Sequence, residues 1–263
     1  MKLIFWGTRG SSPVIGHLHE GFNSHHSPCV EFVCANDSVI VDAGTALGDA
    51  IRSKYKSGKR EFSICLSHFH WDHILGLISI YDLFYTGIKL KIYSAEERSQ
   101  EYISTLYFGA YCPIDPSIVS RSLEFVHVKK TAKISGFDIS FSEVPHAGKT
   151  FAIEVVRDGR RAIYMSDVNL TELKNSPFLE SPDLLICDSF HLKKDHETRR
   201  DWGHSSGEQA AQFATAIKAR TLALFHYDPN YTESEISAVL AEATSASPEL
   251  KIIAPQDNES VDI

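Results

Sequence analysis

The residues most able to do chemistry lie together in one short stretch, residues 67–73, which reads SHFHWDH. Three histidines and one aspartate fall within six consecutive positions of it, as His68, His70, Asp72 and His73. In an extended segment His68 and His70 project to one side and can chelate one ion, whereas Asp72 and His73 aim elsewhere. A single tetrahedral site made from this peptide alone would be strained. Two neighbouring metal ions, each completed by distant residues, fit the spacing better.

A short β-rich run at residues 61–65 precedes these ligands, so they form the loop that leaves the C-terminal end of a strand. Similar runs recur in both halves of the chain, at residues 2–6, 29–34, 38–44, 88–94, 137–144, 151–157, 161–167, 183–189 and 221–228. Helical patterns occur at residues 47–56, 96–106, 206–220 and 234–244. Strands come first in each half and helices follow, which predicts two sheets packed face to face with helices outside.

No low-complexity linker, repeat or charge block separates the two halves, so we expect one domain over residues 1–263. The stretch 98–125 carries aromatic residues and two prolines between predicted strands. We expect this stretch to be an inserted helical or loop segment that covers a pocket.

Composition restricts the partners and the compartment. The 263 residues carry a formal net charge of -8 without a run of Lys and Arg, which disfavours binding to long nucleic acid through many phosphate contacts. A small anionic substrate remains open, because a metal can supply the positive charge. The 5 cysteines are scattered and form no C-x-x-C pair, which indicates reduced thiols of a cytoplasmic protein. We expect no signal peptide and no membrane contact, and monomer and homodimer both stay open.

The H-x-H-x-D-H pattern resembles the signature of the metallo-β-lactamase superfamily, and the resemblance extends over nearly the whole chain. His146 in VPHAG, Asp167 in YMSDVN and His226 in LALFHYDP occupy the later ligand positions in order. The resemblance implies a four-layer αββα sandwich of α/β class. It also implies two metal sites that share one bridging ligand, with His68, His70 and His146 in the first site, Asp72, His73 and His226 in the second, and Asp167 as the bridge.

The same resemblance gives a role to Asp42 in SVIVDAG, which would hydrogen-bond a ligand imidazole and fix its tautomer. Imidazole and carboxylate ligands without thiolate suit two Zn²⁺ ions per chain, and they would also accept Mn²⁺ or Fe. A His-x-Glu variant of the signature would indicate the redox branch of the fold. This chain has His70 in that place, so we expect hydrolysis by a hydroxide that the two zinc ions activate.

A second informative segment, DWGHSSGEQ, predicts the start of a helix. Ser205 stands three residues before Glu208 and would form a capping box, with His204 just ahead of it. A phosphate held by the metals would lie near this helix terminus, and His204 could donate a proton to the departing alkoxide. The arrangement looks like the phosphodiesterase branch that includes Z-type ribonucleases and phosphoribosyl cyclic phosphate phosphodiesterases. In that branch an acidic residue orients the histidine, and Asp188 holds this position here, with His191 able to share the pairing.

The N-terminal segment FWGTRGSSPV resembles the GTRGS-x-P opening of a bacterial subgroup in the same branch. Polar side chains of this turn and of the predicted helix start are our candidates for substrate contact: Thr8, Arg9, Ser11 and Ser205. A structural role is the equal alternative for Arg9. The chain departs from the subgroup at His25 and His26, which either face solvent or line the mouth of the pocket.

The substrate class follows from a missing feature. Z-type ribonucleases carry a long Gly-rich arm that grips tRNA, but only 20 residues, VNLTELKNSPFLESPDLLIC, separate Asp167 from Asp188. We therefore expect cleavage of a small phosphodiester, a cyclic nucleotide or cyclic sugar phosphate, with catalytic roles for Asp72, His204 and Asp188. An exonuclease on short oligonucleotides and an ester or lactone hydrolase of the same fold are the enzyme alternatives. From another class, a protein that binds a nucleotide without turnover stays open.

Overall fold

The computed structural model describes residues 1–14, 23–107, 112, 114–173 and 181–263. Within these residues the strands form two seven-stranded mixed sheets. Alternation of buried and exposed side chains in strands such as KLIFWG and KLKIYS fits sheets with one face toward a core.

The first sheet is built mainly from the N-terminal half, in the order β14-β1-β2-β3-β4-β5-β6. Its strands are β1 (Lys2–Gly7), β2 (Cys29–Cys34), β3 (Asp37–Val41), β4 (Glu61–Cys65), β5 (Lys89–Ser94), β6 (Leu123–His127) and β14 (Ser260–Asp262). The strands from β3 to β6 run parallel, so their C-terminal ends share one edge of the sheet.

The second sheet is built from the C-terminal half, in the order β13-β12-β11-β10-β9-β8-β7. Its strands are β7 (Thr131–Ile134), β8 (Phe137–Val144), β9 (Thr150–Arg157), β10 (Arg160–Met165), β11 (Leu184–Asp188), β12 (Thr221–Phe225) and β13 (Lys251–Ile253). The strands from β10 to β13 are parallel, and β8 points the same way because both β8 and β10 pair antiparallel with β9.

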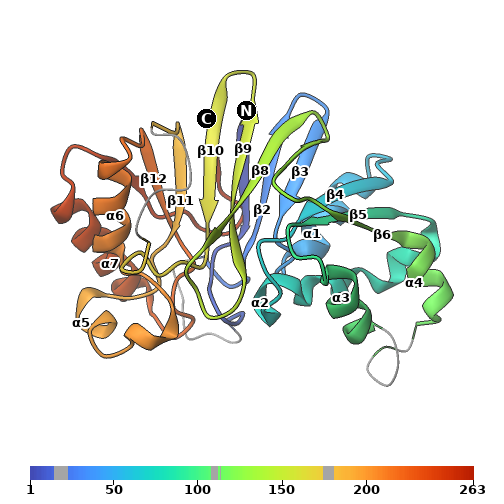
Figure 1. Cartoon of the computed structure of the whole chain (residues 1–263), viewed down its shortest axis with the longest axis horizontal. Coiled ribbons are helices and arrows are strands. Elements are labelled where there is room, and N and C mark those ends of the chain that lie inside the picture. Colours follow the sequence, from blue (N-terminus) through green and yellow to red (C-terminus); the bar gives the residue numbers. More distant parts are fainter. Residues whose placement is uncertain (15–22, 108–111, 113, 174–180) are drawn as a thin grey trace.

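Helices cover the outer faces of both sheets, and Figure 1 shows the two sheets facing each other in the middle of the molecule. Beside the first sheet lie α1 (Leu47–Tyr55), α2 (Trp71–Ile74), the 3-10 segment η1 (Leu75–Thr86), α3 (Ser99–Tyr107) and α4 (Pro116–Ser122). Beside the second lie α5 (Lys193–His196), η2 (Arg200–Trp202), α6 (Gly207–Ala216) and α7 (Glu233–Ala246).

Three hydrophobic clusters fill the spaces between these four layers. The central one joins both sheets and includes Phe5 and Phe32 from the first sheet and Phe137, Tyr164 and Phe225 from the second. The other two clusters lie between each sheet and its helices. The predicted αββα sandwich is therefore confirmed, and one domain over residues 1–263 stays a prediction.

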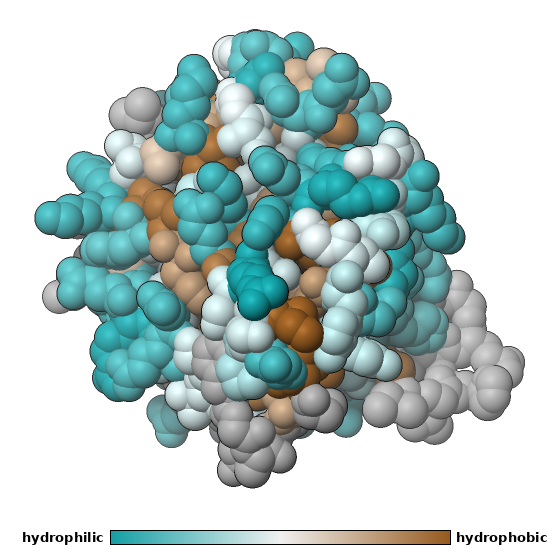
Figure 2. Space-filling view, turned by 90° about the vertical axis from the view of Figure 1, so that its right-hand side faces the viewer, coloured by the Kyte–Doolittle hydropathy of each residue, from teal (hydrophilic) through white to brown (hydrophobic). Residues whose placement is uncertain are grey.

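The surface is mainly polar. Figure 2 shows the side on which α4 and β6 lie, where hydrophilic residues cover most of the area and hydrophobic residues appear in separate places between them. Among the described residues, no helix has both the length and the apolar character needed to span a bilayer.

The four predicted helices are present, with their ends shifted by a few residues. Four strands were not predicted, β6, β7, β13 and β14, and neither was the long segment η1. The stretch 98–125, predicted to be an insertion, contains α3, α4 and the start of β6, while its residues 108–111 and 113 lie outside the described residues. Its role as the cover of a pocket stays a prediction.

Candidate metal centre

The candidate ligands meet at one edge of the sandwich, because each follows the C-terminal end of a strand. His68 follows β4, His146 follows β8, Asp167 follows β10 and His226 follows β12. His73 and Asp72 lie in α2, directly after the loop that leaves β4. Parallel strands deliver their C-terminal loops to the same edge, so the fold brings residues up to 158 positions apart into one cluster.

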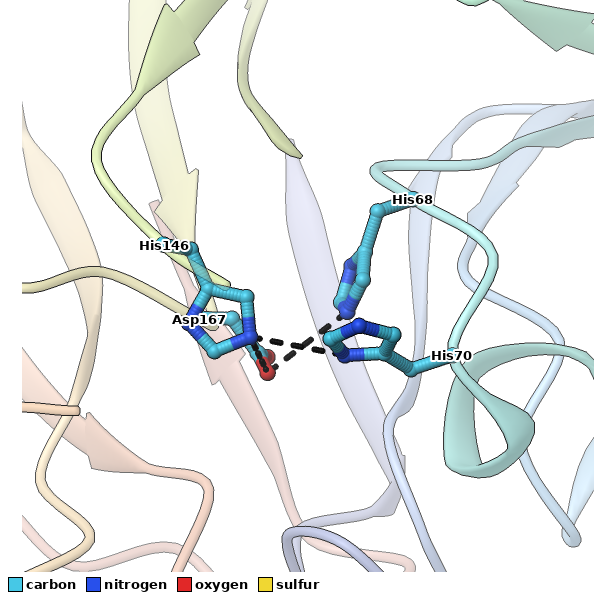
Figure 3. Close-up of side chains that lie close together, drawn as sticks. All are labelled: His68, His70, His146 and Asp167. Carbon is cyan, nitrogen blue, oxygen red and sulfur yellow. Dashed lines mark hydrogen bonds and ion pairs between the residues drawn. The ribbon is translucent and has the colours of Figure 1, made fainter. Parts of the chain in front are cut away.

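The first group of ligands contains His68, His70, His146 and Asp167. Figure 3 shows the two histidines of the β4 loop approaching from one side and His146 and Asp167 from the other. The Asp167 Oδ2 atom lies 3.3 Å from His146 Nε2 and 3.6 Å from His68 Nε2. His146 Nε2 lies 3.4 Å from His70 Nδ1. Four ligand atoms, one from each residue, lie within 4.8 Å of one another.

The second group contains Asp72, His73 and His226, all of them buried. Asp72 Oδ2 lies 3.1 Å from His73 Nε2 and 3.1 Å from His226 Nε2. The other oxygen of Asp167, Oδ1, lies 3.1 Å from the same two nitrogens. Asp167 thus presents one oxygen to each group, which is the arrangement expected of a ligand that bridges two cations.

The unsatisfied atoms of this cluster fit a metal. His68 Nε2, His73 Nε2 and Asp167 Oδ1 are buried and make no hydrogen bond of suitable geometry among the described residues, although the last two lie 3.1 Å apart. Buried polar atoms without partners are costly, and cations among them would satisfy all three. Burial opposes ionisation of Asp167, but the surrounding histidines, His226 foremost, hold the pKa of its carboxyl well below the usual range. A charged carboxylate and imidazoles without thiolate suit a Zn²⁺-type ion.

For His146 and His73, outer contacts fix which ring nitrogen faces the candidate metal site. His146 Nδ1 lies 2.8 Å from the Gly203 carbonyl oxygen, which can only accept, so this nitrogen carries the proton. The Nε2 lone pair of His146 is then free to bind a metal. His73 Nδ1 lies 2.7 Å from Asp42 Oδ2 and by the same reasoning donates to it, as expected for Asp42 from the sequence.

Asp42 connects the two ligand groups. Besides His73, its carboxylate accepts hydrogen bonds from the Tyr164 hydroxyl at 2.8 Å and from the Ser67 backbone N–H and hydroxyl, both at 2.8 Å. The Ser67 hydroxyl is in turn 3.0 Å from His68 Nδ1. Asp42 and His226 also have left-handed backbones, with φ values of 60° and 63°. Such strain in non-glycine residues persists only where surrounding contacts enforce it.

His204 lies beside the ligands and is held by Asp188. Its Nδ1 donates to Asp188 Oδ2 at 2.8 Å, and its ring centroid is 5.0 Å from that of His146 and 5.1 Å from that of His226. Burial lowers the pKa of His204, but the Asp188 carboxylate outweighs burial and raises the pKa to about 9. His204 is therefore protonated at neutral pH, and its Nε2 can carry a proton toward the cluster.

His191, the other partner considered for this pairing, does not share it. Both of its ring nitrogens are buried and without a hydrogen bond to any described residue. Burial lowers its pKa to about 4, so the ring stays neutral at neutral pH.

The predicted capping box is displaced by one residue. Ser206, not Ser205, caps α6, and its partner is Gln209 rather than Glu208. Ser205 is fully buried, and its hydroxyl donates to the Val168 carbonyl and accepts from the Leu170 N–H. The cap shifts because the Ser205 hydroxyl is used in hydrogen bonds that join the loop after Asp167 to the loop that carries His204.

The N-terminal turn contains two buried candidates for substrate contact. Arg9 is fully buried, and its guanidinium donates to the backbone carbonyls of Ser24, Asp228 and Tyr231 at 2.8 to 2.9 Å. The Thr8 hydroxyl is also fully buried and lies 3.0 Å from a carboxylate oxygen of Asp257. These contacts within the protein favour a structural role for Arg9 and Thr8 over contact with substrate.

The last candidate, Ser11, reaches the ligands through its backbone. Its N–H donates to Asp72 Oδ2 at 2.8 Å, the same oxygen that faces His73 and His226. At Gly10 an added Cβ would lie 2.4 Å from His226 Nδ1, so no larger residue fits there. The turn therefore packs directly against the second ligand group.

Sequence reasoning missed several residues that build this site. Asp257 accepts from the backbone N–H groups of Thr8, His25 and His26 and so holds two loops together. Tyr164 and Gly203 were also missed, although they contact Asp42 and His146. No local pattern signals a partner such as Asp257, 249 positions from Thr8. Tyr164, three residues before Asp167, could have been found as a buried tyrosine that needs an acceptor.

Comparisons with known proteins agree with this geometry. Residues 38–227 match the family described as "Beta-lactamase superfamily domain". A protein named "Ribonuclease Z" from Bradyrhizobium sp. (strain ORS 278) is 30% identical over 312 positions, covering 99% of this chain and 99% of that protein. Among solved structures, the metallo-beta-lactamase fold protein YhfI from Bacillus subtilis has a TM-score of 0.76 at 18% identity, covering 99% of this chain and 98% of the other. A diphosphatase from the PhnP family has a TM-score of 0.70 at 17% identity, covering 99% and 96%.

The chain belongs to the metallo-β-lactamase superfamily. Its sequence relatives include ribonucleases Z, and its structural neighbours share the fold. Together with the cluster of histidines and aspartates that could hold a metal ion, these relationships make it a metal-dependent hydrolase.

Proposed function

We propose that this metal-dependent hydrolase cleaves small phosphodiesters of the cyclic nucleotide or cyclic sugar phosphate type. One observation carries the proposal, namely that the bridging arrangement at Asp167 lies beside His204, whose Nδ1 donates to Asp188. The first feature suits an anionic reacting group between two cations, and the second suits a poor leaving group that needs a proton.

The proposed cofactor is a pair of Zn²⁺ ions, with Mn²⁺ or Fe as substitutes. His68, His70 and His146 would hold one ion, Asp72, His73 and His226 the other, and Asp167 both. When bound, such a pair lowers the pKa of a coordinated water and neutralises the charge of a phosphodiester.

The remaining chemistry belongs to side chains of the chain itself. The carboxylate of Asp72 or of Asp167 would accept a hydrogen bond from an attacking water and orient it. His204 Nε2 gives its proton to the departing alkoxide, while Asp188 keeps the ring in place through Nδ1. Ser11 would act through its backbone N–H on Asp72, whereas Arg9, Thr8 and Ser205 would hold the surrounding loops.

The net charge and the length of the chain both favour a small substrate. The net charge of -8 opposes a long polyanion. The alignment with the Bradyrhizobium relative spans 312 positions against 263 residues in this chain, so that relative carries residues without a counterpart here. A shorter chain without the arm expected for tRNA fits a small substrate. Ribonuclease activity is the second candidate, because the full-length relative bears that name.

A substrate panel tests the proposal on protein of measured metal content. It contains 2′,3′-cyclic and 3′,5′-cyclic nucleotides, a cyclic ribose phosphate without a base, bis(p-nitrophenyl) phosphate, short oligonucleotides, a precursor tRNA and a lactone. We expect turnover of cyclic phosphodiesters well above that of the other compounds, and none with an Asp167→Ala variant purified in parallel. Preference for the precursor tRNA would support the second candidate. Lactone cleavage without phosphodiester cleavage, or equimolar nucleotide binding without product, would overturn the assignment.

A further inference from the structure

The loop that carries His68 and His70 also forms one wall of an apolar pocket that no step of the proposed mechanism uses. It has a volume of about 380 Å³ and is lined by Phe69, Trp71, Ile74, Tyr102, Thr105 and Leu106. We propose that this pocket binds the base of a nucleotide substrate and that Trp71 is the surface on which the base stacks. This inference rests on the proposed function, because it specifies the substrate class of the same site.

Trp71 is unusual in its exposure and in its place in the chain. It lies between His70 and Asp72, one candidate ligand from each group, and begins helix α2. Its side chain is 62% exposed, although burying a tryptophan is normally favourable. His70, its neighbour, lies at the solvent-accessible edge of the ligands. An exposed indole in the loop that carries the candidate ligands is available to bind a flat ring.

The rest of the pocket suits a flat, uncharged ring. Phe69 and Tyr102 pack edge to face with their centroids 5.4 Å apart, joining the ligand loop to helix α3. The guanidinium of Arg98 lies 5.0 Å from the Tyr102 ring and pairs with Glu101, so its charge is already matched. Apolar walls and a volume near the lower end of small-molecule sites fit a nucleobase better than a charged group or a long chain.

The connection to the ligands favours a substrate over an unrelated molecule. One continuous segment, from His68 through Asp72, supplies both ligands and pocket walls. A phosphodiester bound at the cations that His70 and Asp72 would hold lies close to the loop that also carries Trp71. Stacking needs no hydrogen-bond pattern, so this pocket would accept several bases.

Direct binding tests the subsite without catalysis. Adenosine is titrated into protein stripped of metal by chelator, followed by tryptophan fluorescence and by equilibrium dialysis. The chain has 3 tryptophans, so the Trp71→Ala variant shows how much of the signal comes from Trp71. We expect about 5- to 150-fold weaker binding for Trp71→Ala, the usual range for removal of one stacking aromatic. Trp71→Phe should recover most of the affinity, and Tyr85→Ala, an aromatic of 61% exposure outside the pocket, should bind like the unmodified protein.

Steady-state kinetics distinguish loss of base binding from a general disturbance of the loop that carries the candidate ligands. With metals restored, Trp71→Ala should raise KM for a 2′,3′-cyclic nucleotide by a similar factor and leave KM for the base-free cyclic ribose phosphate unchanged. Equal effects on both substrates, or adenosine binding that is absent or does not depend on Trp71, would overturn the subsite. Adenosine binding that depends on Trp71, in a protein that cleaves no phosphodiester, would keep the subsite and reject the proposed function.

Discussion

The two halves of the molecule supply the candidate metal centre in different ways. The N-terminal half delivers His68, His70, Asp72 and His73 from one loop and the helix turn that follows it. The C-terminal half delivers one ligand from each of three strand ends, at His146, Asp167 and His226. Local geometry can hold the first set, whereas the second set forms only when the sheet aligns its strands. The two sets then meet only because a shared core packs the sheets together. The complete centre is therefore a property of the folded sandwich.

Of all the substitutions considered, replacement of Asp167 should have the largest effect, because Asp167 contacts the candidate ligands of both halves. Asp167→Ala removes both oxygens that face the two ligand groups, which leaves two cations with less negative charge between them. We expect metal content to fall from about two ions per chain to one or fewer, with turnover at background. Elemental analysis and the phosphodiester assay measure this. Asp201→Ala, an exposed acid of the same half, is the control. A variant with full metal content and activity would contradict the bridge.

His204 tests whether the C-terminal half contributes chemistry beyond ligands. His204→Ala should retain both metals yet lose about 10²- to 10⁴-fold in rate on a cyclic nucleotide, the usual range for a positioned general acid. The loss on bis(p-nitrophenyl) phosphate should be much smaller, because nitrophenolate leaves without a proton. Equal loss on both substrates would mean that His204 only positions substrate or helix α6.

The pH profile is the control for this role. The Asp188 carboxylate raises the pKa of His204 to about 9, so the general acid is available below that pH and the rate falls as pH rises through it. Asp188→Asn removes the negative charge, and the decline should begin at lower pH than in the unmodified protein. A decline at the same pH in both proteins would assign it to another group.

Asp42 tests how far the N-terminal half depends on its outer contacts. Asp42→Asn exchanges the carboxylate that accepts from His73 and Tyr164 for an amide, which weakens the tautomer control of His73. We expect metal affinity or activity to fall about 10- to 100-fold. A competitive chelator titration measures the affinity, with Asp49→Asn, an exposed acid of α1, as the control. Unchanged affinity in Asp42→Asn would show that the loop holds its own geometry.

Arg9 connects the two halves through buried hydrogen bonds. Its substitution should lower the free energy of unfolding without changing catalysis. Arg9→Met removes the donors to Ser24 in the first half and to Asp228 and Tyr231 in the second. We expect a loss of roughly 2 to 5 kcal/mol in the free energy of unfolding, since buried carbonyls lose charged partners. Denaturant unfolding measures it, and KM and metal content should be unchanged. A raised KM with unchanged stability would support substrate contact instead.

The same contrast explains what could be predicted from sequence. Alternating strands, four helices and the H-x-H-x-D-H cluster carry local signals, whereas the later candidate ligands were expected only from the family resemblance. The strands β13 and β14 have three residues each, which is too short for a hydrophobic alternation to be recognised. The strand β6 begins inside the stretch 98–125, which was predicted to be an insertion. The capping box shifted from Ser205 to Ser206 because a tertiary hydrogen bond to Val168 competes for the first serine.

The sequence by itself determined the kinds of candidate ligand, their order along the chain and the layered fold, because donor chemistry and hydrophobic alternation are local properties of the residues. Only the tertiary structure decided which residues surround that centre. It placed Asp188 on His204, enclosed Arg9 among three backbone carbonyls, and brought Asp257 to Thr8 across 249 positions. It also left Trp71 exposed beside an apolar pocket. Burial and hydrogen-bond partners between distant segments exist only after the two sheets pack, so no local pattern encodes them.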